Sequence, residues 1–560
     1  MDKILHIENL TVEFDQPGSK VRAVDDISFE LKEGQSLGVV GESGSGKSVT
    51  SLSILNLLKY QKDNQTTGKI IFSNQDAPSE ILDLTERYLS RIRGGMIGLV
   101  FQEPMSSLNP VMRCGKQVEE VLKTHDVVEQ SAFRDRVISL LEKVRLDDTE
   151  RIYRSYPHQL SGGQLQRVNI AMALAGEPQI LICDEPTTAL DVTVQKEVVT
   201  LLKDLVSEES LAMIFVCHDL DLVSEICDSV IVMNNGKIVE QGPLPDTFNS
   251  PKHSYTKALL QCKPQPSKKT LKLPTIESII QGGEASKFRP AHTRSEEVVL
   301  VVKNLTKTYV QSHVTFFSRP QLFNALSQIN FELSQGEILG VVGESGSGKS
   351  TLAGCIAGLF PISGGAMKYR SREYDYRTLQ TDKSLRRDIQ LIFQDPYGSL
   401  NPRMTIGRCI AEPILYHRII ESEMEAKTRV IELLERVGLE ASHFDRYPHE
   451  LSGGQRQRVC IARALAVQPK LLICDECVSA LDVSVQAQIL NLLDELRASL
   501  GLSMIFISHD LSVVHYISDR IIVMKDGYMV ESGTADEIMF SPSSDYTQAL
   551  INSIPGSDHF

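Results

Sequence analysis

The sequence predicts an α/β protein in which one kind of domain occurs twice. Three observations support this prediction: the chain repeats its own motifs in the same order, short apolar runs end at glycine-rich loops, and other stretches have helical periodicity. The stretch GVVGESGSGKS occurs at 38–48 and again at 340–350. A repeat of this length does not arise by chance, so the chain contains an internal duplication.

Further motifs follow this repeat in the same order in both halves. They are FQEPMSSLNP at 101–110 and FQDPYGSLNP at 393–402, YPHQLSGGQLQRV at 156–168 and YPHELSGGQRQRV at 447–459, LICDEPTTALDVTVQ at 181–195 and LICDECVSALDVSVQ at 472–486, and MIFVCHDL at 213–220 and MIFISHDL at 504–511. We therefore expect a first domain at 1–262, a linker at 263–297 and a second domain at 298–560. The linker segment contains Pro, Gly, Ser and Lys without sustained periodicity, although its SIIQ piece is a candidate for local packing.

Within each half, strands and helices are expected to alternate. SLGVV at 36–40 and its counterpart ILGVV at 338–342 are short apolar runs typical of buried parallel strands. SVIVMNNGKIVEQG at 229–242 and RIIVMKDGYMVESG at 520–533 each predict strand, turn and strand, because NNG and KDG supply residues that tolerate a left-handed turn. KEVVTLLKDLVSEE at 196–209 has apolar residues at the spacing of an amphipathic helix.

Composition limits the class of protein. The chain has 560 residues, which suits several domains, with 42% hydrophobic and 23% charged residues, as in globular proteins. A net charge of −14 argues against a protein that wraps nucleic acid. No apolar run approaches the roughly 18–20 residues that span a bilayer, and the first residues do not resemble a secretory signal. We therefore expect the chain in the cytoplasm, with any membrane association made through partners.

GESGSGKS predicts a phosphate-binding loop in each half. Its glycines allow backbone N–H groups to surround phosphate oxygens, and the helix that follows presents its positive end. The lysine would neutralise phosphate charge and the serine after it would bind Mg²⁺. The predicted loop residues are Gly41, Glu42, Ser43, Gly44, Ser45, Gly46, Lys47, Ser48 and Val49, and then Gly343, Glu344, Ser345, Gly346, Ser347, Gly348, Lys349, Ser350 and Thr351. The alternative is an ordinary glycine-rich turn, which two copies after apolar strands make a poor explanation.

Two carboxylates follow a second apolar strand in each half. Asp184 and Asp475 are expected to hold Mg²⁺, and Glu185 and Glu476 to polarise the attacking water. An acidic strand end on its own would be common, so the prediction depends on the phosphate loop as well.

LSGGQ at 160–164 and 451–455 supplies another anion-binding helix start in each half. Since each half already has a phosphate loop, this additional site requires an explanation. With it, the series of motifs resembles two ATP-binding cassettes of ABC transporters. The resemblance covers nearly the whole chain except the linker, and it implies tandem ABC-type P-loop NTPase domains. Each would have a mainly parallel core sheet, an antiparallel β subdomain and a helical subdomain.

The resemblance also implies roles for individual residues. In this family the signature of one cassette completes the ATP site of the other, which explains why a single chain carries two loops and two signatures. The signature residues are Ser161, Gly162, Gly163 and Gln164, and Ser452, Gly453, Gly454 and Gln455. The switch histidines are His218 and His509, and the Q-loop glutamines near Mg²⁺ and the attacking water are Gln102 and Gln394. Phe14 and Tyr309 fall where the family stacks an aromatic ring on adenine, with a role in the core as the alternative for Phe14.

The flanking residues resemble the dipeptide, oligopeptide and nickel importers of bacteria. SPKHSYTKALLQ at 250–261 and SPSSDYTQALINS at 541–553 are similar to the ending of that group, and a fused pair most resembles the Yej-type ATPase of peptide and microcin importers. The resemblance implies ATP and Mg²⁺ as cofactors and two membrane permeases as partners. It also implies an indirect periplasmic binding protein, no nucleic acid, and a place on the cytoplasmic side of the inner membrane. The chain would act as a monomer, an internal pseudo-dimer of cassettes.

Two rival classes are soluble ABC translation factors and DNA-repair ABC ATPases. The first usually join their cassettes by a long charged helix, and the second carry zinc modules or long coiled coils, which this sequence does not suggest. One departure concerns the signature helices. Leu165 and Met172 of the first half stand where the second has Arg456 and Arg463, so the two sites are not expected to be fully equal.

Overall fold

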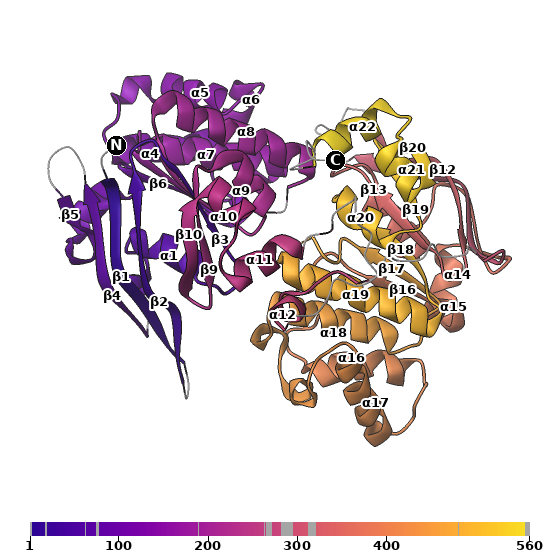
Figure 1. Ribbon diagram of the computed structural model, residues 1–560. Coiled ribbons are helices and arrows are strands. Elements are labelled where there is room, and N and C mark those ends of the chain that lie inside the picture. The colour runs from indigo at the N-terminus through magenta and orange to yellow at the C-terminus, as the bar shows by residue number, and fades with distance from the viewer. Residues whose placement is uncertain are drawn as a thin grey trace. The chain divides into compact units, whose positions relative to one another are not determined.

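The computed structural model of the chain forms two compact units (Figure 1). The first comprises Met1–Cys262 and Ile276–Gly283, and the second Lys263–Thr275 and Glu284–Phe560. The residues described are 3–16, 19–61, 63–73, 78–188, 190–262, 264, 272–281, 295–311, 321–479 and 481–554. Each unit combines a mainly parallel sheet, an antiparallel sheet and helices, so the predicted α/β fold class is confirmed.

The central sheet of the first unit has the strand order β10-β9-β3-β8-β7-β6. Its strands are β3 (Ser36–Val40), β6 (Ile97–Val100), β7 (Ile180–Asp184), β8 (Ala212–Cys217), β9 (Ser229–Asn234) and β10 (Lys237–Pro243). Neighbouring strands run parallel except β9 and β10. Every residue of β3, β7 and β8 is buried, as expected for short apolar strands covered on both faces.

An antiparallel sheet and several helices complete the first unit. The antiparallel sheet contains β1 (Lys3–Gln16), β2 (Ser19–Lys32), β4 (Asn64–Ser73) and β5 (Pro78–Glu80) in the order β2-β1-β4-β5. The helices are α1 (Lys47–Ile54), α2 (Glu86–Ile92), α3 (Pro104–Ser107), α4 (Cys114–Thr124), α5 (Phe133–Lys143), α6 (Thr149–Arg154), α7 (Gly162–Leu174), α8 (Val192–Glu209), α9 (Leu220–Ile226), α10 (Leu244–Asn249), α11 (Ser254–Gln261) and α12 (Ile276–Ile280).

The second unit repeats this topology. Its central sheet has the order β16-β17-β18-β13-β19-β20 and its antiparallel sheet the order β12-β11-β14-β15. The strands are β11 (Val298–Gln311), β12 (Gln321–Ser334), β13 (Ile338–Val342), β14 (Gly364–Tyr369), β15 (Arg372–Tyr374), β16 (Ile389–Ile392), β17 (Leu471–Asp475), β18 (Ser503–Ile507), β19 (Arg520–Lys525) and β20 (Tyr528–Thr534). The helices are α13 (Lys349–Ile356), α14 (Tyr376–Thr381), α15 (Lys383–Asp388), α16 (Ile406–Tyr416), α17 (Glu423–Arg436), α18 (Gly453–Leu465), α19 (Val483–Leu500), α20 (Leu511–Ile517), α21 (Ala535–Phe540) and α22 (Asp545–Asn552).

The predicted hairpin is present in both units. β9 and β10 pair antiparallel across a turn in which Asn235 and Gly236 have φ angles of 48° and 79°. In the second unit, Asp526 and Gly527 take the same left-handed conformation, with φ angles of 48° and 81°. The NNG and KDG sequences were therefore correctly interpreted as turns whose φ angles are positive.

Parts of the predicted linker pack against a unit. The backbone N–H of Leu273 donates to Asn491 Oδ1 and Asn491 Nδ2 donates to the Leu273 carbonyl, both at 2.9 Å, within the second unit. Leu273 is buried there. The SIIQ piece forms most of α12, which packs against α11 within the first unit. Much of the remaining linker falls outside the described residues.

Candidate functional site

The phosphate loop of the first unit connects β3 to α1 at the carboxyl end of a central strand. Gly46 has a φ of 102°, and a Cβ there would come within 2.5 Å of the Ala23 carbonyl oxygen. Gly348 of the second unit repeats this, with a φ of 101° and a Cβ that would lie 2.5 Å from the Ala325 carbonyl oxygen. Only glycine fits such a position, because both the backbone angle and the close approach exclude a side chain. The glycine at this position is therefore required for the conformation of each phosphate loop.

The loop lysines are buried and are held by the loop itself. Lys47 Nζ donates to the carbonyl oxygens of Gly41 and Glu42 at 2.7 and 2.9 Å. Lys349 Nζ donates to Gly343 and Glu344 at 2.7 and 2.8 Å. An ammonium group that two loop carbonyls hold in place supplies the positive charge that suits a phosphate-binding loop.

A serine and an aspartate meet beside each loop. Ser48 Oγ donates to Asp184 Oδ1 at 3.0 Å, and Ser350 Oγ to Asp475 Oδ1 at 3.1 Å. Burial raises the pKa of Asp184 and of Asp475 to about 6. A buried carboxylate next to a hydroxyl is an oxygen donor set that suits Mg²⁺, because a bound cation would favour the ionised form that burial disfavours. The residues present therefore fit the expected metal.

The glutamates that follow these aspartates adopt an uncommon backbone conformation. Glu185 and Glu476 both have a φ of 46°, in the left-handed region that non-glycine residues seldom occupy. Their backbone N–H groups donate to Val216 and Ile507 at 2.9 and 3.0 Å, which fixes the bend at the strand end. Strained residues of this kind concentrate at functional sites. The sequence analysis selected both glutamates but gave no sign of this conformation.

The predicted glutamine and histidine converge on the glutamate in the first unit. Gln102 Nε2 donates to Glu185 Oε2 at 3.0 Å, His218 Nδ1 lies 3.3 Å from the same oxygen, and Lys47 Nζ lies 4.0 Å from Oε1. Thr188 Oγ1 also donates to Oε2, at 3.0 Å, and was not predicted. Burial would raise the pKa of Glu185, but the hydrogen bond and charge of His218, the charge of Lys47 and the Thr188 hydroxyl lower it below its ordinary value. The carboxylate is thus kept ionised.

The second unit has the same arrangement of glutamine, histidine and lysine, but Ser479, at the position of Thr188, donates to the backbone carbonyl of Glu476 at 2.9 Å instead of to its carboxylate. Gln394 Nε2 donates to Glu476 Oε2 at 2.7 Å, His509 Nδ1 lies 3.5 Å from that oxygen, and Lys349 Nζ lies 3.9 Å from Oε1. Burial would lower the pKa of His509, but Glu476 raises it above its ordinary value. An ionised carboxylate with a glutamine and a histidine beside it can orient a water molecule and accept its proton.

Each signature forms the first turn of a helix. Ser161 is the N-cap of α7, with the Gln164 N–H donating to Ser161 Oγ at 3.3 Å and the Ser161 N–H to Gln164 Oε1 at 3.2 Å. Ser452 and Gln455 form the same capping box on α18. These contacts lie within the signature and do not join it to the phosphate loop of the same unit.

The predicted adenine-stacking residues differ in their surroundings. Phe14 is partly buried and packs against the core between the two sheets of the first unit. Tyr309 is 36% exposed, lies edge-on to Phe360 and has Lys307 Nζ 4.7 Å from its ring centre. The packing of Phe14 is what the alternative role in the core predicts, whereas Tyr309 has an accessible ring.

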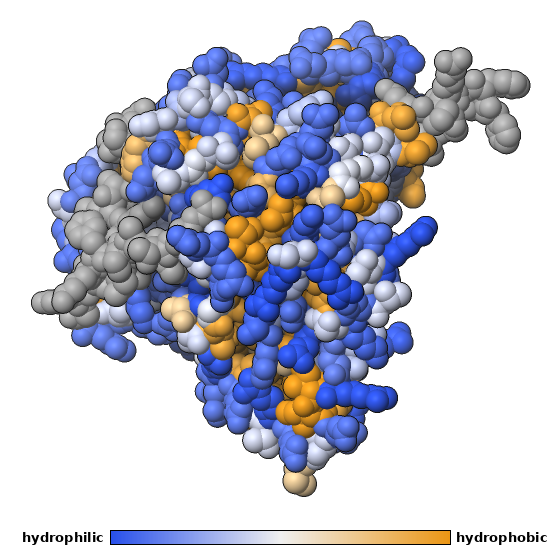
Figure 2. Space-filling view, turned by 90° about the vertical axis from the view of Figure 1, so that its right-hand side faces the viewer, coloured by the Kyte–Doolittle hydropathy of each residue, from blue (hydrophilic) through white to orange (hydrophobic). Residues whose placement is uncertain are grey.

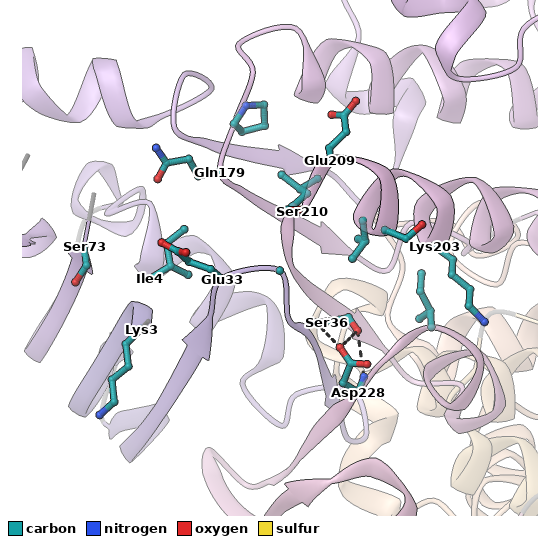
Figure 3. A pocket seen from close by; sticks show the side chains of 16 residues that line it. Lys3, Ile4, Glu33, Ser36, Ser73, Gln179, Lys203, Glu209, Ser210 and Asp228 are labelled. Carbon is teal, nitrogen blue, oxygen red and sulfur yellow. Dashed lines mark hydrogen bonds between the residues drawn. The ribbon is translucent and has the colours of Figure 1, made fainter. Parts of the chain in front are cut away.

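A hollow of about 1000 Å³ in the first unit is unrelated to these residues (Figure 3). It lies at the start of β3, where Ser36 donates from N and Oγ to Asp228 Oδ2 at 3.0 and 2.7 Å, and Val206 of α8 also lines it. At the position of Val206 the second unit has Arg497, which is buried and lies 3.1 Å from Asp519. The second unit thus has a longer, buried side chain at this position. The hollow of the first unit lies at the end of β3 opposite to the phosphate loop.

The chain was compared with protein-family models and with known proteins. The model described as "ABC transporter" matches residues 24–188 and 326–479, more than half of the chain. The chain belongs to the ABC transporter family. A second model, "Oligopeptide/dipeptide transporter, C-terminal region", matches residues 239–287 and 530–559. The repeated matches agree with the internal duplication.

Similar ABC proteins align over nearly the whole chain. "Glutathione import ATP-binding protein GsiA" of Pectobacterium atrosepticum is 41% identical, covering 99% of this chain and 90% of that protein. The protein of the same name from Escherichia coli strain K12 is 42% identical, with 99% and 89% covered. "Peptidoglycan transport ATP-binding protein YejF" of Agrobacterium fabrum is 44% identical, with 98% and 96% covered.

As an ABC ATP-binding protein, the chain is an ATPase that binds ATP. None of the helices that the structure describes has both the length and the apolar character needed to cross a bilayer. The sequence analysis missed one contact of the loops. Tyr255 and Tyr546, in the C-terminal regions, each bond to the backbone of a phosphate loop. The repeated YT pair in SYTKAL and DYTQAL was the available signal.

Proposed function

We propose that this chain is the ATP-hydrolysing subunit of a bacterial importer of peptides or peptide-like compounds. The observation that carries the proposal is the match of the oligopeptide/dipeptide transporter C-terminal region, which occurs after each cassette. Full-length similarity to ATP-binding proteins named for glutathione import and peptidoglycan transport supports it. Di- and oligopeptides, and compounds that resemble them, are therefore the candidate substrates.

In this proposal each ATP site uses the groups that converge on one glutamate. Asp184, Ser48 and Gln102 hold Mg²⁺ in the first unit, and Asp475, Ser350 and Gln394 hold it in the second. Glu185 and Glu476 accept the proton of the attacking water, and the switch histidines orient the glutamates. The signature serines and glycines complete the site of the other cassette. The contacts support these roles, since the carboxylate of each glutamate lies within 4.0 Å of the loop lysine.

The proposed partners are two membrane permeases and, indirectly, a substrate-binding protein. The helices between each Q-loop glutamine and its signature are the candidate docking region. On α16 and α17 of the second unit, Leu415, Tyr416 and Met424 are exposed apolar residues. Figure 2 shows apolar surface among hydrophilic side chains near the lower end, where these helices lie. The ATPase would therefore act at the inner face of the bacterial inner membrane.

The test is reconstitution of the chain in lipid with its permeases, with and without binding protein loaded with glutathione or a mixture of dipeptides. ATP turnover of the chain alone is expected to be low and to rise when all partners are present, since binding free energies at linked sites are reciprocal. Equal turnover under all conditions would contradict the importer role. Pelleting with ribosomes instead of membranes would favour the alternative of a two-cassette ATPase that acts on ribosomes or nucleic acid.

A further inference from the structure

A tyrosine of the C-terminal region contacts the phosphate loop in each unit. The backbone N–H of Glu42 donates to Tyr255 Oη at 3.2 Å, although the two residues are 213 positions apart in the chain. The Tyr255 hydroxyl also lies 3.4 Å from Glu42 Oε2. In the second unit, the Glu344 N–H donates to Tyr546 Oη, again at 3.2 Å. Glu42 and Glu344 are the second residues of GESGSGKS, so the contact is made with the loop itself.

A glutamate fixes the start of each tyrosine-bearing helix. Glu240 of β10 accepts the backbone N–H groups of Lys252 and His253 at 2.8 and 3.1 Å, just before α11. Glu531 of β20 accepts the N–H of Ser543 at 2.7 Å, just before α22. Charge-assisted hydrogen bonds of this kind are stronger than neutral ones. Each tyrosine is therefore presented from a helix whose first turn is anchored to the edge of the central sheet.

The two tyrosines are supported differently around their rings. Tyr255 is fully buried, and α12 packs against its helix. Tyr546 is half-buried, with Lys525 Nζ 4.6 Å from its ring centre. Asn234 stands at the position of Lys525 in the first unit. The hydroxyl contact with the loop is thus the same in both units although the packing around it differs, which indicates that the contact is not a by-product of one local arrangement.

We propose that Tyr255 and Tyr546 are positioning residues that hold the phosphate loops in the conformation that grips the phosphates of a nucleotide. The inference rests on nucleotide binding at these loops, as set out in the proposed function. The carbonyl of Glu42 is bonded to Lys47, whose amine would also serve the phosphates. The N–H of Glu42 is bonded to Tyr255, which has no part in phosphate chemistry. The tyrosine therefore fixes the Gly41–Glu42 peptide at the start of the loop. In this way the C-terminal region contributes to the nucleotide site.

Removal of the hydroxyl alone tests this role in the full-length chain. Tyr255→Phe is made in a Lys349→Ala background and Tyr546→Phe in a Lys47→Ala background, so that each titration reports one loop. With Mg²⁺ and ADP as the probe, affinity is expected to fall about two- to tenfold, the effect of one neutral hydrogen bond. The melting temperature of the nucleotide-free chain is expected to stay near that of the parent, while the stabilisation produced by a fixed ADP concentration decreases.

Matched controls remove a tyrosine hydroxyl elsewhere in each unit. Tyr153 bonds to Glu119 and Tyr369 to Asp388, and their Tyr→Phe variants are expected to leave ADP affinity unchanged. Parental ADP affinity in both test variants would overturn the inference without affecting the proposed function. A melting temperature that falls together with affinity would also overturn it, because the tyrosine would then be structural. Absence of ADP binding by the unmodified chain would count against the proposed function instead.

Discussion

The two cassettes share the geometry of the phosphate site but differ in the connection between the Q-loop and the signature helix. The serine-to-aspartate hydrogen bonds measure 3.0 and 3.1 Å, and the lysine-to-glutamate distances measure 4.0 and 3.9 Å. Both glutamates have a φ of 46°. This agreement is expected if both sites transfer phosphoryl groups, because displacing a catalytic group by about 1 Å lowers the reaction rate strongly.

In the second cassette, α18 is bonded to the segment that follows Gln394. Arg463 Nη1 donates to the Ser399 carbonyl at 2.6 Å, and Cys460 Sγ lies 3.2 Å from Ser399 Oγ. The Arg456 guanidinium lies 5.2 Å from the ring centre of Tyr397. Three side chains of one helix therefore contact the segment Tyr397–Ser399.

The first cassette has Leu165, Asn169 and Met172 at the corresponding positions of α7. Asn169 Nδ2 donates to the Phe101 carbonyl at 3.4 Å, which is a longer bond to a residue before the glutamine. Leucine and methionine cannot replace the hydrogen bonds of arginine. The difference indicates that duplication preserved the chemical centre and allowed the connection to the signature to diverge, so the two sites should be equal in chemistry and unequal in coupling.

The largest expected effect is on ATP turnover, and it tests whether both sites hydrolyse ATP by the same chemistry. Glu185→Gln and Glu476→Gln, made separately, should each lower ATP turnover of the chain with its proposed partners by about 100-fold or more per site, because the proposed proton-accepting base is lost. Glutamine keeps the shape of the side chain, so nucleotide binding serves as the control and should persist. The measurement is ATP turnover of each variant and of the unmodified chain with all proposed partners present. A variant with unchanged turnover would mean that its site is degenerate and that the two centres are not equivalent.

Local features of the fold and site could be predicted from the sequence. Short apolar strands, the NNG and KDG turns and the phosphate loops depend on neighbouring residues, and the structure has them where they were expected. The convergence of Gln102 and His218 on Glu185 followed from family resemblance, since no local rule places residues of three separate segments together.

Long-range contacts could not be predicted. Tyr255 reaches the phosphate loop because packing of α11 sets its position, and a sequence pattern holds no information about that packing. The conformation of Glu185 was also hidden, because strain at a strand end is imposed by the hydrogen bond to Val216 on the next strand. The hollow beside Val206 likewise depends on which neighbouring side chains fill the space.

A smaller effect tests whether Asp184 and Asp475, the aspartates proposed to hold Mg²⁺, are equally buried. The pKa of Asp184 and of Asp475 is raised to about 6 by burial, so the folded chain holds these protons more tightly than the unfolded chain. Their contribution to stability therefore decreases as the pH rises from about 4 through 6. Asp184→Asn and Asp475→Asn mimic the protonated form. Each should raise the free energy of unfolding of the Mg²⁺-free chain by about 2–3 kcal/mol at pH 7.5 and by less than about 1 kcal/mol at pH 4.

Denaturant unfolding in a chelator at the two pH values provides the measurement. Asp382→Asn is a control of opposite sign, because hydrogen bonds from Ser384 and neighbouring groups lower the pKa of Asp382 to about 2. That substitution should destabilise the chain at pH 7.5. Unequal gains for Asp184→Asn and Asp475→Asn would show that the two aspartates differ in burial, contrary to the shared geometry.

The smallest expected effect is on amide hydrogen exchange. It tests the connection between the Q-loop and the signature helix, which differs between the two cassettes. Arg463→Met gives the second cassette the residue of the first and removes the hydrogen bond to the Ser399 carbonyl. A bond from a charged donor contributes about 1.5–3 kcal/mol when buried, and less here because Arg463 is partly exposed. Amide hydrogen exchange of residues 397–400 should therefore become about tenfold faster, since about 1.4 kcal/mol corresponds to that factor. Met172→Leu in the first cassette is the matched control and should leave exchange of residues 105–108 unchanged.

The same two variants separate coupling from chemistry. If the bonds of Arg463 link the Q-loop to the signature helix, Arg463→Met should lower the turnover stimulated by permeases while the low turnover of the isolated chain stays the same. Met172→Leu should change neither rate. Because Arg463 lies outside the groups that surround Glu476, a loss of basal turnover would contradict its role in coupling and place it with the chemical centre. Equal exchange and equal stimulation in Arg463→Met and the unmodified chain would mean that the difference between the cassettes has no mechanical consequence, and that both sites couple alike despite their different helices.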